Sequence, residues 1–64
     1  MDSSWIHTIA HDEDTGTLSV ELSSGKIYDY HDVPTDVAAQ FKQADSKGTY
    51  HNYKIRDVYH YDVR

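Results

Sequence analysis

The chain has 64 residues, enough for one domain with a small core and no more. It contains no cysteine, so disulfides and thiolate zinc sites are excluded. Its formal net charge of −5 at pH 7 argues against strong non-specific binding to nucleic acid.

The charges are unevenly distributed along the chain. Residues 1–41 carry eight acidic side chains against Lys26 alone, a net charge of −7. Residues 42–64 carry five cations against three acids, a net charge of +2, so the last third is the part that can present a basic surface. The N-terminus has no basic region followed by an apolar run, and no segment is as long as a membrane span. We therefore expect a cytoplasmic protein that makes no contact with a membrane.

Two segments near the N-terminus predict a hairpin. Trp5–His11 is rich in β-branched and aromatic residues, which indicates a strand. Simple alternation puts one set of its side chains on a common face, namely Trp5, His7, Ile9 and His11. Thr17–Leu22 alternates cleanly, as a half-buried strand does, and its apolar side is Leu18, Val20 and Leu22. Gly16, in the acidic stretch between these segments, suits the positive φ of a hairpin turn.

The segment Lys26–His31 predicts a third strand, after a turn at residues 23–25. Tyr28 and Tyr30 lie on one face of it, and Asp29 and His31 on the other. Because the aspartate and the histidine prefer water, we expect the tyrosines to face the same side as the aliphatic residues of the second strand. Three strands with short loops predict an antiparallel meander.

An amphipathic helix is predicted over residues 35–44. Pro34 suits a helix start, and Thr35 or Asp36 can cap the helix or complement its dipole. The apolar positions follow helical spacing, at Val37, Ala38, Phe41 and Ala44. Residues 45–48 should stop the helix, with Gly48 just past its end. If its apolar side packs on the tyrosine face of the sheet, the result is a two-layer α+β core.

The last sixteen residues fit two alternatives. The apolar spacing of Tyr50, Ile55 and Val58 or Tyr59 fits a short helix over about residues 50–56. Residues 58–63 fit an edge strand equally well, and we favour the helix slightly.

Several fragments in this order resemble the KTSC domain. They are Gly25, Tyr28-Asp29-Tyr30, Val33-Pro34 and Ser46-Lys47-Gly48-x-Tyr50-x-Asn52-x-x-Ile55-Arg56-x-x-Tyr59. That family is named for the C-terminal end of some lysyl-tRNA synthetases and also occurs as free-standing proteins, with tyrosine-x-tyrosine as its usual mark. The resemblance implies a single domain over residues 1–64 and, through the synthetase, an RNA-binding accessory function. His11 and His51 stand where the family pattern leads us to expect aromatic residues.

Eight residues are candidates for contact with RNA. The two tyrosines of the third strand can stack on bases, and the basic tail offers cations, an amide and further rings. The full set is Tyr28, Tyr30, Lys47, Tyr50, Asn52, Lys54, Arg56 and Tyr59. The alternative is a structural role for each, with the rings in the core, Asn52 capping a turn and the cations merely solvated. The pattern favours this alternative, because the tyrosines share the aliphatic face and charged runs are usually solvated.

Other kinds of site have weaker support. His7 and His11 share a face beside three acids, but i and i+4 positions on a strand are about 13 Å apart at roughly 3.3 Å per residue. That distance is too long for one shared metal ion, and the Asp-x-Asp turn lacks the later glutamate of a calcium loop. Ser46 has no neighbouring base. We therefore predict no metal, no cofactor and no catalytic residue.

The alternative to RNA is a protein partner. A basic protein would suit the acidic sheet face, and a second copy of the chain would suit an unpaired strand edge. The sequence leaves the oligomeric state open.

Overall fold

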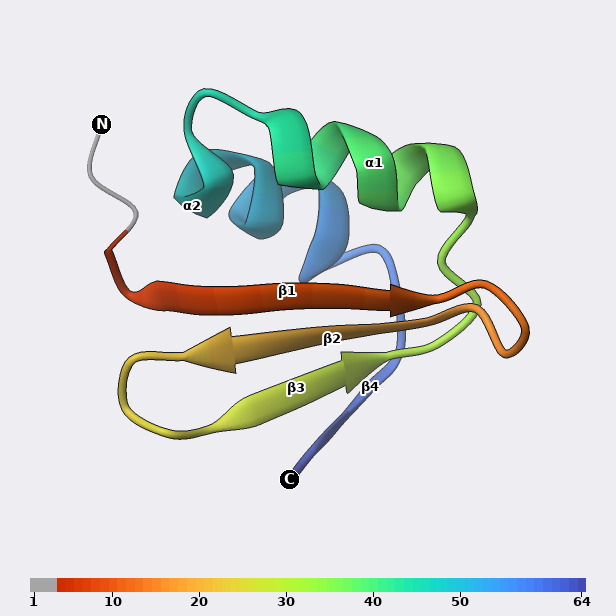
Figure 1. Cartoon of the computed structure of the whole chain (residues 1–64), viewed down its shortest axis with the longest axis horizontal. Helices are drawn as coiled ribbons and strands as arrows, with labels where there is room; N and C mark the ends of the chain where they lie inside the picture. Colours follow the sequence, from red (N-terminus) through yellow and green to blue (C-terminus); the bar gives the residue numbers. More distant parts are fainter. Residues whose placement is uncertain (1–3) are drawn as a thin grey trace.

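The computed structural model describes residues 4–64, which form a four-stranded antiparallel sheet with helices on one side (Figure 1). The elements in chain order are β1 (Ile6–Asp12), β2 (Thr17–Leu22), β3 (Ile27–Tyr30), α1 (Thr35–Gln43), α2 (Lys47–Tyr50), η1 (His51–Ile55) and β4 (Tyr61–Val63). The strands lie in the order β1-β2-β3-β4, and every neighbouring pair is antiparallel. The predicted α+β meander is confirmed, and a fourth strand extends it at one edge.

The tyrosine side of the sheet is the core side, as predicted. Leu18 lies opposite Tyr30 and Val20 opposite Tyr28, and residues paired in this way project from the same face. Leu18 and Val20 are fully buried and Tyr30 is 1% exposed, whereas Tyr28 is half-buried. The helices contribute Ala38, Phe41 and Ile55 to the same buried cluster. The helical layer therefore covers the face that carries the tyrosines.

A β-bulge corrects the predicted alternation in β1. Ile6 pairs with Leu22 while Thr8 pairs with Glu21, so β1 has one extra residue at this point. Because the bulge changes the phase of the alternation, Ile6 joins Ile9 on the core side. His7 is exposed, and its Nδ1 lies 3.6 Å from the Glu21 carboxylate. The prediction that His7 shares a face with Ile9 is therefore wrong.

Gly48 does not cap α1, which ends at Gln43. Gly48 lies instead inside α2, whose first turn is capped by Ser46: the Ser46 hydroxyl accepts a hydrogen bond from the Thr49 N–H. The glycine is buried against the indole of Trp5, and a Cβ there would lie only 3.1 Å from two of the ring atoms. It is the close approach of the tryptophan that requires a glycine here.

At its other end, α1 begins after Pro34 without a side-chain cap, and Asp36 lies in the first turn, where a carboxylate complements the dipole.

Both alternatives for the last sixteen residues occur, at different positions. Residues 47–55 form the helical turns α2 and η1, and residues 61–63 form the strand β4. η1 is a π-helical turn, in which the Arg56 N–H donates to the His51 carbonyl at 2.8 Å. His51 and Ile55 lie on its buried side. Among residues 4–64, no helix combines the length and the apolar character needed to cross a membrane.

Candidate functional site

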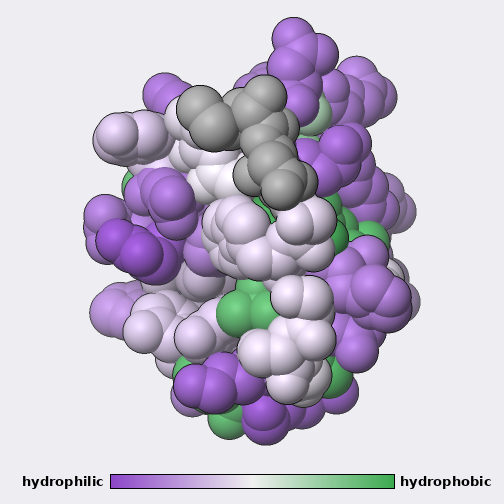
Figure 2. Space-filling model, turned by 90° about the vertical axis from the view of Figure 1, so that its left-hand side faces the viewer, coloured by the Kyte–Doolittle hydropathy of each residue, from purple (hydrophilic) through white to green (hydrophobic). Residues whose placement is uncertain are grey.

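A pocket of about 150 Å³ opens where β3 and β4 meet the π-helical turn η1. We call it the aromatic pocket, and its lining residues are Trp5, Leu22, Tyr28, Tyr30, His51, Asn52, Arg56 and Tyr61. Figure 2 views the molecule from the end where the described chain begins and where α2 lies. A pale band of intermediate hydropathy, with green apolar patches, runs between purple hydrophilic flanks on that face.

Ring-to-ring contacts run from the buried floor of the aromatic pocket to its rim. The His51 ring meets Tyr30 with centroids 5.6 Å apart, and Tyr30 meets Tyr61 at 5.4 Å. Tyr61 also makes an edge-on contact with Tyr28 at 5.4 Å and 82°. These separations are in the favourable range for aromatic pairs. Tyr61 is nevertheless 46% exposed, so much of this ring is available to another molecule.

The floor of the aromatic pocket is a neutral hydrogen-bonded pair. The Tyr30 hydroxyl lies 2.7 Å from His51 Nε2, and both residues are buried. Burial raises the pKa of Tyr30 to about 12. Burial also lowers the pKa of His51; the Asn52 side chain opposes this shift, and the charge of Arg56 adds to it. Both rings are therefore uncharged at neutral pH. Within the described residues His51 Nδ1 has no hydrogen-bond partner.

Two exposed polar side chains, Asn52 and Arg56, stand at the rim. They are four residues apart, Asn52 within η1 and Arg56 at its C-terminal cap, and both line the aromatic pocket. The guanidinium of Arg56 lies 3.9 Å from the Asp57 carboxylate, in a pair that is largely solvated. Such an exposed pair is worth little energy, so the guanidinium can turn toward a ligand at small cost.

The structure brings four of the eight predicted RNA-contacting residues together at the aromatic pocket. These are Tyr28, Tyr30, Asn52 and Arg56. Tyr30 is buried and bonded to His51, so its ring forms part of the floor and offers no free face for stacking.

The other four predicted residues lie elsewhere. Lys54 is exposed on η1 without lining the pocket, and the Lys47 ammonium donates to the Ala44 carbonyl at 3.4 Å. Tyr50 stacks on Phe41 at 5.7 Å, and Tyr59 packs against the core.

Sequence reasoning missed four lining residues, which are Trp5, Leu22, His51 and Tyr61. Tyr61 joins the site because β4 pairs with β3 in a register that places it opposite Tyr30. His51 precedes the buried Ile55 by four residues, a helical spacing that would have marked it as inward-facing. Trp5 reaches the site through the close contact with Gly48, which no sequence pattern announces.

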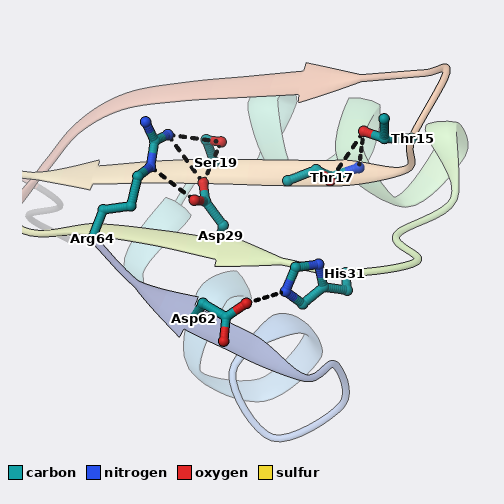
Figure 3. A network of polar contacts seen from close by, with 7 residues as sticks. All are labelled: Thr15, Thr17, Ser19, Asp29, His31, Asp62 and Arg64. Atoms are coloured by element: carbon teal, nitrogen blue, oxygen red, sulfur yellow. Dashed lines mark hydrogen bonds and ion pairs between the residues drawn. The ribbon is translucent and has the colours of Figure 1, made fainter.

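The opposite face of the sheet is polar, and its acids are matched with cationic or titratable partners (Figure 3). Asp29 accepts a hydrogen bond from the Ser19 hydroxyl at 2.6 Å and lies 2.8 Å from Nε of Arg64. The hydrogen bond from Ser19 lowers the pKa of Asp29, and Arg64 reinforces the shift. Asp62 is 2.7 Å from His31. The ion pair with Arg64 reduces the unbalanced negative charge that a basic partner would meet on this face.

The histidines considered as metal ligands are engaged separately. His11 Nε2 lies 2.8 Å from the Val33 carbonyl oxygen, which it reaches across 22 residues of sequence, while His7 faces Glu21. Within residues 4–64, no three histidine, aspartate or glutamate side chains gather closely enough to hold a metal ion.

A family model, related sequences and a solved structure each match most of this chain. The family model described as the KTSC domain matches residues 2–59. A lysine–tRNA ligase of Nostoc sp. is 34% identical over 61 residues, which are 95% of this chain but 11% of the ligase. An uncharacterized protein of Stutzerimonas stutzeri is 36% identical over 52 residues, 81% of this chain and 73% of that protein.

The crystal structure of a KTSC domain protein from Yersinia pestis superposes with a TM-score of 0.87. The two sequences are 28% identical, and the match covers 97% of this chain and 87% of the other. The chain thus corresponds to most of the small relatives and to about a ninth of the ligase.

Proposed function

Given that this chain belongs to the KTSC domain family, we propose that it is an RNA-binding accessory module that holds an unpaired base in the aromatic pocket. The observation that carries this proposal is the half-exposed ring of Tyr61 beside Tyr28, at the mouth of a pocket with an uncharged floor. Nucleobases are flat and neutral, and they stack on such rings with about 1–3 kcal/mol per base.

The rim residues supply the polar part of recognition. The guanidinium of Arg56 offers several donors to a phosphate, and the amide of Asn52 can both donate to and accept from a base edge. The similarity to lysine–tRNA ligases supports the choice of RNA, since those proteins are named for a tRNA. This chain corresponds to a small part of those ligases, so no ligase activity is proposed for it.

The test exploits Trp5, the single tryptophan of the chain, which lines the aromatic pocket. Its fluorescence should change when an RNA that contains an unpaired base is added at low salt. Tyr61→Leu keeps an apolar side chain on β4 but removes the stacking ring, and it should weaken binding about 5- to 150-fold.

The matched control is Tyr53→Leu, because Tyr53 is 75% exposed and does not line the pocket. This variant should bind RNA as the wild type does. If the wild-type chain shows no response to RNA at low salt, the proposal is wrong.

A protein partner is the second candidate, because within residues 4–64 β4 pairs with β3 on one side and with no strand on the other. All three residues of β4 are exposed, including Tyr61 and Val63, and an open edge of this kind can pair with another strand. Self-association through β4 would appear as a concentration-dependent sedimentation coefficient. A strict monomer over the whole concentration range would exclude it.

A further inference from the structure

The aromatic pocket has the volume of about one base, and a cation stands at its rim. Three wider cavities of about 680, 350 and 310 Å³ occur on the described part of the chain, and no phenylalanine, tryptophan or tyrosine lines any of them. Four such rings line the 150 Å³ pocket, whose volume is close to that of a single base.

The cations of the chain are spread over several parts of the molecule. Of its six lysine and arginine side chains, Arg56 alone lines the aromatic pocket, and Lys54 is the nearest in sequence. Lys42 and Lys47 line a separate cavity with Ile6, His7 and Ile9. Arg64 is bound to Asp29 on the opposite face of the sheet. Lys26, in the loop before β3, also lies outside the lining, so among residues 4–64 a phosphate at the aromatic pocket faces one lining cation, Arg56.

The floor of the aromatic pocket also restricts which ligands can bind there. The hydrogen-bonding groups of Tyr30 and His51 Nε2 are used by each other, and both rings are uncharged. The positive charge at the rim disfavours a cationic occupant. A ligand with a neutral flat ring and a negative group on one side fits both the uncharged floor and the positively charged rim.

Building on the proposed function, we infer that the domain recognises a single extrahelical nucleotide, such as a bulged or terminal base, and does not bind a run of single strand. The base lies against Tyr61 and Tyr28, and its phosphate faces Arg56. Affinity then comes chiefly from one stacked base and one or two phosphate contacts.

The salt dependence of the affinity distinguishes recognition of a single nucleotide from binding of a longer strand through several phosphates. Each phosphate contact on single-stranded RNA contributes a slope of about −0.7 in log affinity against log salt. Between 50 and 200 mM salt, one or two contacts reduce affinity by about 2.6- to 7-fold, whereas four contacts reduce it by about 50-fold.

The experiment compares three RNAs by the fluorescence of Trp5: a hairpin with one bulged nucleotide, the same hairpin fully paired, and an eight-nucleotide strand. We expect the bulged hairpin to bind at least tenfold more tightly than the paired one. Its affinity should fall less than tenfold between 50 and 200 mM salt. Arg56→Gln should flatten this salt dependence, and Lys42→Gln, on a separate cavity, should leave it unchanged.

Three other outcomes would each contradict the inference, and they differ in what they imply for the proposed function. If the eight-nucleotide strand binds best and loses about 50-fold over the same salt range, the single-nucleotide inference is overturned while the RNA-binding proposal stands. If trimethyl-lysine competes with the bulged hairpin, the pocket prefers cations and the inference fails. If none of the three RNAs binds, the inference and the proposed function both fail.

Discussion

Acid should destabilise this domain through His51. The side chain is 3% exposed and lies among the rings of Trp5, Tyr30 and Phe41, with centroids between 5.4 and 6.0 Å away. Burial is the main cause of its lowered pKa, because an imidazolium at this position would lose its hydration. The unfolded chain exposes the same histidine to water, where its pKa is about 6.5.

The sign and the size of this pH effect on stability follow from the difference in proton binding to His51 between the folded and the unfolded chain. At pH values above about 6.5 both states hold a neutral His51, and the stabilising contribution of this group is complete. As the pH falls below this value, the unfolded state binds a proton that the folded state does not. Stability is therefore lost as the pH falls toward the lowered pKa of the folded state. Between pH 7.5 and 5.5 the loss reaches at most about 1.4 kcal/mol, which corresponds to roughly 6–11 °C in Tm for a domain of this size.

The assay is urea unfolding followed by circular dichroism at pH 7.5 and pH 5.5. His51→Gln is the control, since glutamine does not titrate and keeps a polar group near the Tyr30 hydroxyl. The wild type should lose more stability than this variant, and the difference between the two cancels the contributions of all other groups. Equal losses in the two proteins would refute the reasoning.

Three further changes test the packing. Tyr30→Phe removes the partner of His51 Nε2 and should cost about 1–3 kcal/mol in urea unfolding, with little change in secondary structure. Gly48→Ala forces a Cβ to within 3.1 Å of Trp5, and the overpacking cost of about 1–3 kcal/mol should exceed the helix-propensity gain of about 1 kcal/mol. The displaced indole should also shift its fluorescence emission, and an unchanged spectrum would contradict the contact. Phe41→Ala should cost about 3–5 kcal/mol, a large share of the stability of a small domain, so circular dichroism at 25 °C should detect unfolded chain.

The layers of this fold could be predicted from the sequence because they depend on periodicity. The alternation of Leu18, Val20 and Leu22 fixed the buried face of β2, and the polar residues Asp29 and His31 then indicated where the tyrosines of β3 point. The helical spacing of the residues around Phe41 gave the face of α1 that meets the sheet. These are local patterns, and the structure confirms each of them.

The bulge in β1 could not be predicted in the same way. It depends on how Ile6 and Thr8 pair with β2, and a single extra residue reverses the side on which His7 lies. The role of Gly48 could not be predicted from the local sequence either. Glycine is common just after a helix, but a glycine is required at this position by the close approach of Trp5.

The sequence by itself thus determined a two-layer α+β domain, its aliphatic core and the segment that carries most of its positive charge. Only the tertiary structure decided which aromatic residues meet, because the aromatic pocket joins Trp5, the strands β2, β3 and β4, and the turn η1. Tyr61 and Tyr30 are 31 positions apart in the sequence and become neighbours when β4 pairs with β3. A contact of that kind depends on strand register, which is set by the packing of the whole sheet and not by the local pattern around either tyrosine.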